Sequence, residues 1–319
     1  MARIPKKYTF VQVNHAKLSD VEELYRLSYG VSPSLESLDN KYNTNALGLD
    51  FVGIVAYSEQ YEPAAYYGVF PMQFLLGEKP VLAAQSGDTM TSPFHRMKGL
   101  FVESAHRTYA IAARSGIHFV FGFPNENSYP GFKSKLNWEF TGNMQNFKLK
   151  LRVLPLAAVS KRFGKWVNRI CFPLLLRRLR KYSLSIDDLD PKAIQTNRNS
   201  AVFRDKHFLE YKKKNGAEFV KVDDFEMFVK IDGALLIGDV IPFTAERFGQ
   251  FLKAVATVAR QAFCHRVIFS LSQQHWLYSY FVENGHCPLE SLPIGFVPFL
   301  GFKADWSEIT FGRLDYDTF

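Results

Sequence analysis

The chain has 319 residues, of which 47% are hydrophobic and 15% aromatic. A chain of this length and composition exceeds the usual size of one compact core, so two domains are expected. No signal-peptide pattern opens it and no uncharged stretch of about 18 apolar residues occurs, which predicts a cytoplasmic protein, neither exported nor membrane-spanning. Three scattered cysteines, Cys171, Cys264 and Cys287, exclude a disulfide framework and a cysteine-based metal site.

The net charge of +8 comes from one segment. Between positions 161 and 181 the chain has eight basic residues and no acidic one: Lys161, Arg162, Lys165, Arg169, Arg177, Arg178, Arg180 and Lys181. Without these eight, the 39 Lys and Arg fall to 31, the number of Asp and Glu. Nucleic acid is therefore not needed as a partner of the remaining chain.

The same segment has the pattern of a basic amphipathic helix. Apolar residues recur at helical spacing along it: Phe163, Trp166, Val167 and Ile170. Its apolar face can pack on the protein, or the segment can lie on an anionic membrane surface, which would place the protein at the inner face of the membrane. Contact with RNA or an acidic protein is the third alternative, and all three stay open.

The first half is predicted to alternate strands and helices. In chain order we expect a strand at 8–13, a helix at 19–28, extended segments at 51–57, 64–74 and 82–91, a long helix from 99 to 115, a strand at 118–123 and a short helix that ends at 136–138. The strand at 118–123 is apolar throughout, which indicates a central position in a sheet.

The turn between the strand at 82–91 and the long helix carries the first functional signal. Arg96, Met97, Lys98 and Gly99 occupy this turn. A glycine turn that opens a helix leaves backbone N–H groups free where the helix dipole is positive, and these groups attract phosphate. The turn is therefore a candidate site for a pyrophosphate.

The second half repeats part of this order. We expect a strand at 234–240, a helix at 244–263, a strand at 266–271 and a short helix at 275–283. Aligning Val120 with Val267 matches helix, strand and short helix in both halves, which indicates an internal duplication. The segment Pro242-Phe243-Thr244-Ala245 stands where the first half has its basic turn, so one cofactor site per chain is expected.

The turn resembles the acyl-CoA-binding motif of the GCN5-related N-acetyltransferase (GNAT) superfamily, Q/R-x-x-G-x-G/A. Arg96 and Gly99 match its first and fourth positions, and Phe101 replaces the final small residue. Asn125 and the segment Leu136-Asn137-Trp138 are similar to later features of the family. The resemblance implies an α/β fold with a mixed sheet in two GNAT-like domains, each with a mostly antiparallel central sheet flanked by helices. The expected division is an acyl-CoA-binding domain at 1–150, a basic amphipathic linker at 151–190 and a degenerate GNAT-like domain at 191–319.

The resemblance also implies that acetyl-CoA enters a gap between the strands at 82–91 and 118–123. The residues expected to bind it are Met90, Thr91, Arg96, Met97, Lys98, Gly99, Leu100 and Asn125. No metal is expected, because the histidines and cysteines do not form a set of ligands.

The motif does not specify the catalytic groups. Direct attack of an amine on the thioester needs a base and an acid. Asp88 and Glu126 are the candidate bases, although Asp88 also suits a turn after Gly87 and Glu126 suits a helix start. The family often uses a tyrosine as acid at the position of Phe132 or Lys133, so Tyr129 is its substitute here, or it only packs against the cofactor.

These features predict an acetyl-CoA-dependent N-acyltransferase that acts directly on a primary amine. An amino sugar or related envelope-glycan precursor, nucleotide- or lipid-linked, is the expected acceptor, because the segment 34–45 resembles the acceptor loop of related acetyltransferases. Tandem halves also resemble transferases that add amino acids to peptidoglycan precursors, so an aminoacyl-tRNA-dependent transferase is one alternative. A non-catalytic membrane-docking or scaffold protein is the other.

Overall fold

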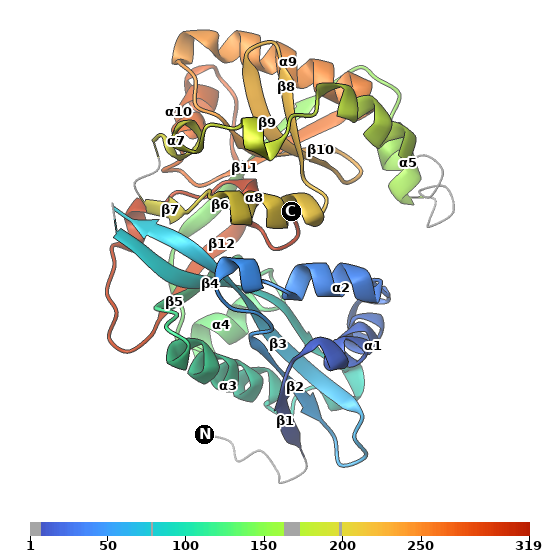
Figure 1. Cartoon of the computed structure of the whole chain (residues 1–319), viewed down its shortest axis with the longest axis vertical. Coiled ribbons are helices and arrows are strands. Elements are labelled where there is room, and N and C mark those ends of the chain that lie inside the picture. Colours follow the sequence, from blue (N-terminus) through green and yellow to red (C-terminus); the bar gives the residue numbers. More distant parts are fainter. Residues whose placement is uncertain (1–7, 78, 163–172, 198–199) are drawn as a thin grey trace. The chain divides into compact units, whose positions relative to one another are not determined.

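The computed structural model describes residues 8–77, 79–162, 173–197 and 200–319 (Figure 1). The chain divides into two compact units. Unit 1 comprises Met1–Gly142 and Pro293–Ser307, and unit 2 comprises Asn143–Leu292 and Glu308–Phe319. The domain boundaries expected after 150 and 190 stay a prediction, while the compact units divide after Gly142.

Unit 1 is built on a mixed sheet. Its strands are β1 (Thr9–Gln12), β2 (Gly53–Tyr57), β3 (Pro63–Leu76), β4 (Lys79–Thr91), β5 (Phe119–Gly122) and the end of β12 (Leu289–Pro298), paired in that order. All neighbours are antiparallel except β4 and β5. The parallel pairing extends only from Ala83 opposite Phe119 to Gln85 opposite Phe121, and the two strands part beyond it.

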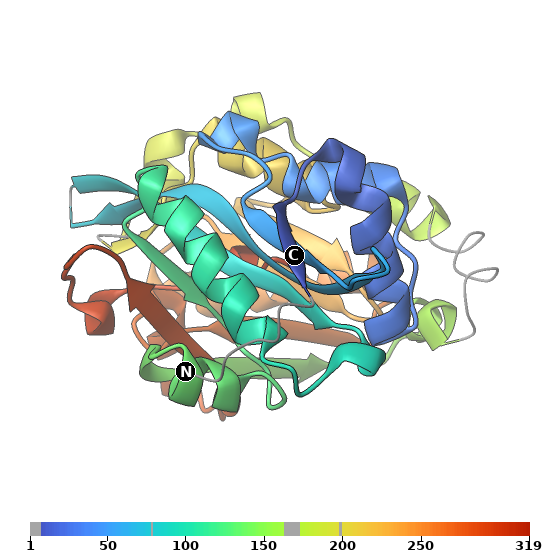
Figure 2. The same ribbon diagram turned by 90° about the horizontal axis from the view of Figure 1, so that it is seen from below.

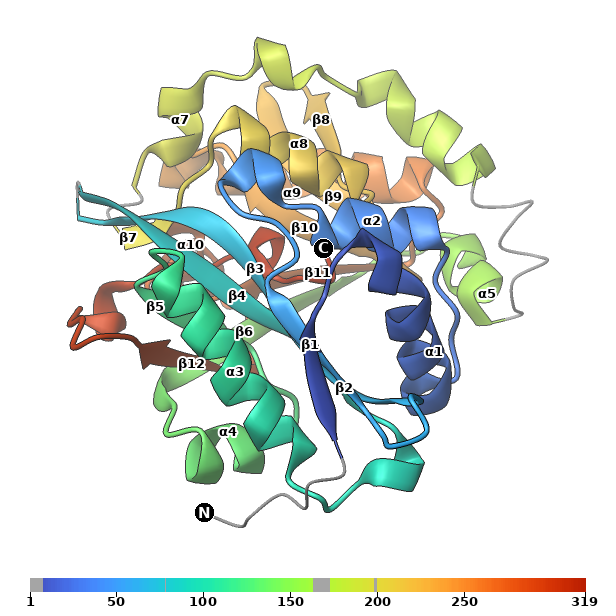
Figure 3. The same cartoon turned by 60° about the horizontal axis from the view of Figure 1, so that its bottom comes forward.

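Helices cover both faces of this sheet. Helices α3 (Leu100–Arg114) and α4 (Tyr129–Lys135) lie on one face, and α1 (Leu18–Tyr29) and α2 (Leu35–Tyr42) lie on the other (Figure 3). Figure 2 shows α3, in teal, running along the strands. Side chains of β3 alternate between these layers, because Tyr67 and Val69 join the core under α3 while Tyr66 and Phe70 pack against Tyr42 of α2.

Unit 2 has a similar sheet. Its strands pair in the order β6 (Glu139–Lys150), β11 (Arg266–Leu271), β10 (Leu235–Val240), β9 (Phe225–Ile231) and β8 (Glu218–Val222). Only β10 and β11 are parallel. The helices are α5 (Leu156–Arg162), α7 (Pro191–Gln195), α8 (Lys206–Lys214), α9 (Phe248–Gln261) and α10 (Trp276–Glu283); residues 173–179 are also helical, and β7 (Ser200–Val202) is a short strand.

Single 3-10 turns connect several of these elements. They span His15–Lys17, Asn45–Leu47, Pro93–His95, Arg180–Tyr182, Ile186–Asp188, Ala245–Arg247, Trp306–Glu308 and Arg313–Asp315. The segment 34–45, likened to an acceptor loop, contains helix α2 instead of open loop, and the Ser34 hydroxyl caps it by accepting from the amide of Ser37.

The structure confirms the predicted repeat. The order β4, α3, β5, α4 recurs as β10, α9, β11, α10, and in both cases the two strands form a short parallel pair. With Val120 matched to Val267, the pairings Ala84 to Val120 and Leu235 to Val267 make Ala84 equivalent to Leu235. Further along the strand, Gln85 is then equivalent to Leu236, and the dipeptide Gly87-Asp88 is equivalent to the identical dipeptide Gly238-Asp239.

The basic segment lies partly outside the described residues, since 163–172 are among those not described. Three of its described basic side chains contact other parts of unit 2, to which the segment itself belongs. Lys161 pairs with Asp232 at 2.7 Å, the Arg178 guanidinium lies 4.7 Å from the centre of the Phe263 ring, and Arg180 reaches Glu218 at 3.9 Å. Among the residues that the structure describes, no helix has the length and apolar character needed to cross a bilayer.

Candidate functional site

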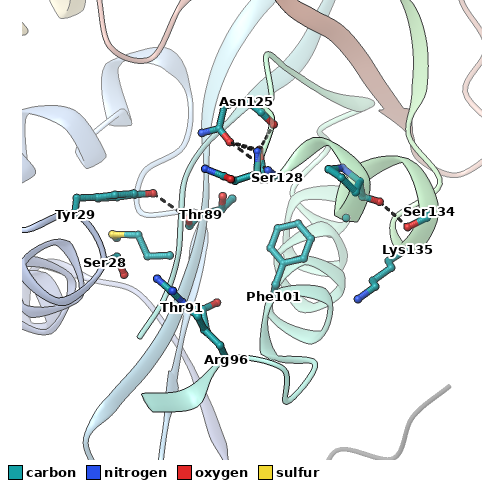
Figure 4. Close-up of a pocket in the computed structure, with 14 residues that line it drawn as sticks. Ser28, Tyr29, Thr89, Thr91, Arg96, Phe101, Asn125, Ser128, Ser134 and Lys135 are labelled. Carbon is teal, nitrogen blue, oxygen red and sulfur yellow. Dashed lines mark hydrogen bonds between the residues drawn. The ribbon is translucent and has the colours of Figure 1, made fainter. Parts of the chain in front are cut away.

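A cavity of about 710 Å³ lies in unit 1 where β4 and β5 part (Figure 4). Three parts of the chain form its walls. They are the end of α1 (Ser28, Tyr29), the end of β4 with the start of α3 (Thr89, Met90, Thr91, Arg96, Phe101), and the segment after β5 with α4 (Asn125, Asn127, Ser128, Pro130, Gly131, Ser134, Lys135). The position is the one expected for the cofactor gap.

A bulge in β4 shapes the strand beside this cavity. Gly68 pairs with Gly87 and Tyr66 with Met90, so Asp88 and Thr89 both lie opposite Tyr67. Asp88 takes a left-handed backbone conformation, with φ at 52°. An extra residue bends a strand and changes the direction of its side chains, and here it coincides with the place where β4 leaves β5.

The backbone conformation of the turn before α3 explains why residue 99 is a glycine. Gly99 is the N-cap of α3 with φ at 76°, which favours a residue without a Cβ. Of the turn residues, Arg96 lines the cavity, whereas the Met97 side chain is fully exposed and the Lys98 ammonium donates to the carbonyl of Phe94. Of the turn's cations, Arg96 is therefore the one that accompanies the free N–H groups of this helix start at the cavity.

Leu100 contributes no side chain to the cavity. It is 2% exposed and packs with the buried alanines Ala56, Ala64 and Ala65. Of the eight residues predicted to bind the cofactor, the cavity walls contain Met90, Thr91, Arg96 and Asn125. Met97, Lys98, Gly99 and Leu100 lie outside the walls, so any contribution from them to a phosphate site comes from backbone amides.

Phe101, the departure from the family motif, has a matching gap in α4. A Cβ on Gly131 would lie 2.9 Å from Cε1 of Phe101, so the missing side chain makes room for the ring. The ring also packs against Phe132, at 5.3 Å between centroids, and Tyr67, at 5.9 Å. The large residue on α3 is thus accommodated by a small one on α4, and both residues line the cavity.

Asn125 is held in a fixed orientation at the end of the β5 segment. Its side-chain oxygen accepts from the amides of Asn127, at 3.0 Å, and Ser128, at 3.2 Å, and from the Ser128 hydroxyl. The side-chain nitrogen points away from these bonds (Figure 4). A donor held in this way suits a polar contact to a ligand in the cavity.

Ten of the fourteen wall residues were not among the predicted binding residues, and four of these ten lie at the C-terminal ends of helices α1 and α4: Ser28, Tyr29, Ser134 and Lys135. The Tyr29 hydroxyl donates to the carbonyl of Thr89 at 3.1 Å, which ties the end of α1 to the bulged strand (Figure 4). Lys135 supplies a second cation from the opposite wall. Nothing in the local pattern of α1 or α4 distinguishes these residues, because only the folding of the helices around the gap brings them to it.

Asp88 points to the α2 side of the sheet and is absent from the cavity walls. Its carboxylate accepts from the Lys41 ammonium at 2.8 Å and from the Tyr42 hydroxyl at 2.7 Å, and its side chain is 9% exposed. Burial, and next the Asp88 charge, raise the pKa of Tyr42 well above its ordinary value. A substrate ammonium would have to displace Lys41 or Tyr42 to reach this carboxylate.

The other two predicted catalytic residues also lie outside the walls. Glu126 is exposed, and the Tyr129 ring packs on Phe140, at 4.7 Å between centroids, with the Lys133 ammonium 5.5 Å from its centre. The roles of Asp88, Glu126 and Tyr129 stay predictions. In the described ranges of the chain, no three metal-ligating side chains cluster.

Comparison with known proteins agrees with this geometry. Residues 11–141 match the family model described as acetyltransferase (GNAT) domain. A putative acetyltransferase from Pyrococcus horikoshii has a TM-score of 0.61 and 13% identity, covering 98% of this chain and 96% of its own. A GCN5-related N-acetyltransferase from Kribbella flavida has a TM-score of 0.58 and 14% identity, covering 91% and 70%.

N-myristoyltransferase of Saccharomyces cerevisiae, solved with bound myristoyl-CoA, has a TM-score of 0.59 and 10% identity, covering 92% of this chain and 82% of its own. No curated protein sequence matches the chain. The family match, which contains the cavity, and the shared fold establish a GNAT-type acyltransferase domain at residues 11–141. The predicted GNAT resemblance and fold class are confirmed.

Proposed function

We propose that the protein transfers an acetyl group from acetyl-CoA directly to a primary amine. The observation that carries the proposal is the cavity between the parting strands β4 and β5, within the segment that matches the GNAT model. Its donors suit a polyphosphate carrier, because Arg96 and Lys135 supply positive charge from two walls of the cavity and the start of α3 adds free backbone amides.

Bound acetyl-CoA supplies the acyl group as a reactive thioester. Arg96 and Lys135 would hold the phosphates, and the side-chain nitrogen of Asn125 would donate to the pantetheine arm. As the amine nitrogen bonds to the carbonyl carbon and the C–S bond breaks, one proton leaves the nitrogen and one reaches the thiolate. Asp88 and Glu126 are the proposed bases. For the acid, Tyr29 is better placed than Tyr129, because it is in the cavity wall.

We propose that the acyl group is short. The lining is mainly polar, with Met90, Phe101 and Pro130 as its larger apolar members. Solved myristoyl-CoA complexes exist for the yeast enzyme of similar fold, so acetyl-, octanoyl- and myristoyl-CoA should be compared directly. We expect the tightest binding for acetyl-CoA.

We further propose an amino sugar of envelope-glycan assembly as the acceptor and a cytoplasmic location. Docking of the segment 161–181 on an anionic membrane surface is part of the same proposal. Liposome co-sedimentation tests it: binding to anionic vesicles at low salt that is lost at high salt supports docking, and absence of binding at both rejects it.

Calorimetric titration with acetyl-CoA and with free CoA tests the central proposal. We expect binding that is lost in Arg96→Glu and in Gly99→Asp, since both place a negative charge at the phosphate end. Arg114→Glu, at the other end of α3 and outside the cavity walls, is the matched control and should bind normally. Absence of heat with the wild-type protein would overturn the proposal and favour the aminoacyl-tRNA or non-catalytic alternatives.

A further inference from the structure

Gln85 is a buried polar residue without a structural explanation. Its side chain is 1% exposed, and neither its amide nitrogen nor its oxygen has a hydrogen-bond partner among the described residues. Leaving both atoms of a buried carboxamide unpaired is costly, so such a group in a native protein calls for a reason.

The position of Gln85 links it to the reaction site. It is the last residue of β4 that pairs with β5, directly before the strands part. It lies opposite Phe70 of β3, and Tyr42 of α2 stacks on that ring at 5.6 Å while the Lys41 ammonium lies 5.2 Å from its centre. Gln85 therefore faces α2, on the opposite face from α3 and α4.

The bulge brings Asp88 to the same face. In a regular strand, residues three apart point to opposite faces. The extra residue and the positive φ of Asp88 turn its carboxylate toward Lys41 and Tyr42 instead. A carboxylate and an unpaired carboxamide thus share the α2 face of β4, next to the gap that holds the reacting thioester under the proposed function.

The second copy of the repeat shows that the fold does not need the amide. The residue equivalent to Gln85 is Leu236, which is also buried, at 6% exposed, and faces away from the core under α9. The equivalent of Asp88 is retained as Asp239. An apolar residue therefore satisfies this strand position in the copy that lacks the basic turn, and the amide distinguishes the copy that has the cavity.

We propose that Gln85 recognises the acceptor amine in unit 1. Its carboxamide bonds a neighbouring group of the acceptor that both donates and accepts hydrogen bonds, a hydroxyl or an amide beside the reacting amine. The inference rests on the proposed function. Access requires α2 to move, and α2 is flanked by Gly30 and Gly48, both with positive φ, and attached to β4 through the bonds of Lys41 and Tyr42 to Asp88.

Binding of three amines to protein saturated with free CoA tests this inference: glucosamine, glycinamide and propylamine. We expect glucosamine, glycinamide or both to bind at least about tenfold more tightly than propylamine, because a site built for a hydrogen bond rejects the analogue without it. Which of the two binds identifies the hydroxyl or the amide as the group recognised. Equal binding of all three would overturn the inference.

The decisive variant is Gln85→Leu, which introduces the residue of the second copy. It should abolish the preference over propylamine, leave affinity for CoA unchanged and leave the melting temperature equal or higher. Gln145→Leu is the matched control, since Gln145 of β6 is also buried, at 5% exposed, but donates to the carbonyl of Asn143; it should keep the preference. A Gln85→Leu protein that keeps the preference would show that the amide has only a packing role. If the wild-type protein did not bind CoA, that result would instead contradict the proposed function.

Discussion

The two copies of the Gly-Asp bulge have the same chemistry in different surroundings. In unit 1, Asp88 is 9% exposed and bonds Lys41 and Tyr42 of α2. In unit 2, Arg204 bonds Asp239 at 2.9 Å and Asp315 at 2.6 Å, and all three side chains are fully buried. The Phe319 ring also packs over the second bulge, where a Cβ on Gly238 would lie 2.4 Å from Cζ of the ring.

This difference distinguishes the residues that the fold requires from the residues that a binding site requires. A carboxylate paired with a cation occurs at both bulges, so the pair is explained by anchoring the bent strand. The amide of Gln85 and the basic turn at Arg96 occur only beside the cavity. The second copy thus keeps the strand geometry with its bulge carboxylate fully buried in an ion-pair network, and the predictions below test that division.

The largest expected effect is in the buried ion-pair network of Arg204, Asp239 and Asp315. Asp239→Ala leaves Arg204 buried with one carboxylate fewer and should lower the free energy of unfolding by about 3–5 kcal/mol. Asp88→Asn should cost less, because its site is partly exposed and asparagine tolerates a positive φ. Urea unfolding of both variants measures the difference, and equal losses would contradict the comparison.

The second effect is a pH dependence in unit 2. Lys212 is 1% exposed, and burial lowers its pKa to about 7, in surroundings that also include Asp315, Asp317, Arg204 and Lys230. The unfolded chain then binds the Lys212 proton more tightly, so this residue makes stability rise with pH from about 7 to about 10.5, by up to a few kcal/mol.

Urea unfolding between pH 7 and pH 9.5 measures this slope. Lys212→Met should reduce it while preserving the packing of the side-chain stem. A slope that is the same in both proteins would show that Lys212 is charged normally in the folded state.

The third effect is expected when the residues at the equivalent positions 85 and 236 are exchanged between the two copies. Leu236→Gln buries an unpaired amide in unit 2 and should cost about 1–3 kcal/mol. Gln85→Leu, the reciprocal change, should cost nothing. Thermal unfolding of the two variants in one buffer compares them, and a larger loss for Gln85→Leu would reverse the inference from the repeat.

A smaller effect is expected at the cavity wall. Gly131→Ala would push the Phe101 ring toward the cavity and should weaken CoA binding by about tenfold, or about 1.4 kcal/mol. Gly249→Ala in α9 is the control, because a Cβ there meets no atom within 4 Å. Calorimetry on both variants provides the measurement, and unchanged affinity in Gly131→Ala would show that the ring has room to move elsewhere.

The smallest effect concerns a single exposed charge. Lys135→Ala should weaken CoA binding by roughly two- to fivefold at low salt, and less at high salt, as for an exposed ion pair. Lys133→Ala, on the same helix but outside the cavity walls, should leave the affinity unchanged. The same loss in both variants would indicate a general charge effect and no specific contact.

The repeating elements were accessible to sequence reasoning because their cores are local patterns. The strand expected at 266–271 is β11 as observed, and the helix expected from Gly99 is α3, whose buried residues Leu100, Ala105, Tyr109 and Ala112 follow helical spacing. The alternation that defines strands and the spacing that defines helices depend on neighbours in the chain, which the sequence contains.

The direction of Asp88 could not be predicted in the same way. Its side chain faces α2 because one extra residue enters β4 opposite Tyr67, and a bulge depends on the pairing of two strands. Tyr29 and Lys135 reach the cavity from helices more than 100 residues apart, so no local pattern signals them. Helix α2 was described only as a loop resemblance, since its eight residues give a short pattern.

The contact between Phe101 and Gly131 also affects how relatives of this protein are recognised. A search pattern that demands a small residue at the sixth motif position would pass over any chain with a large one there. Where the large residue on the first helix is accompanied by glycine on the following short helix, the same space is kept by exchanging which element is small. A search pattern that considers the positions of Phe101 and Gly131 together would still recognise such chains.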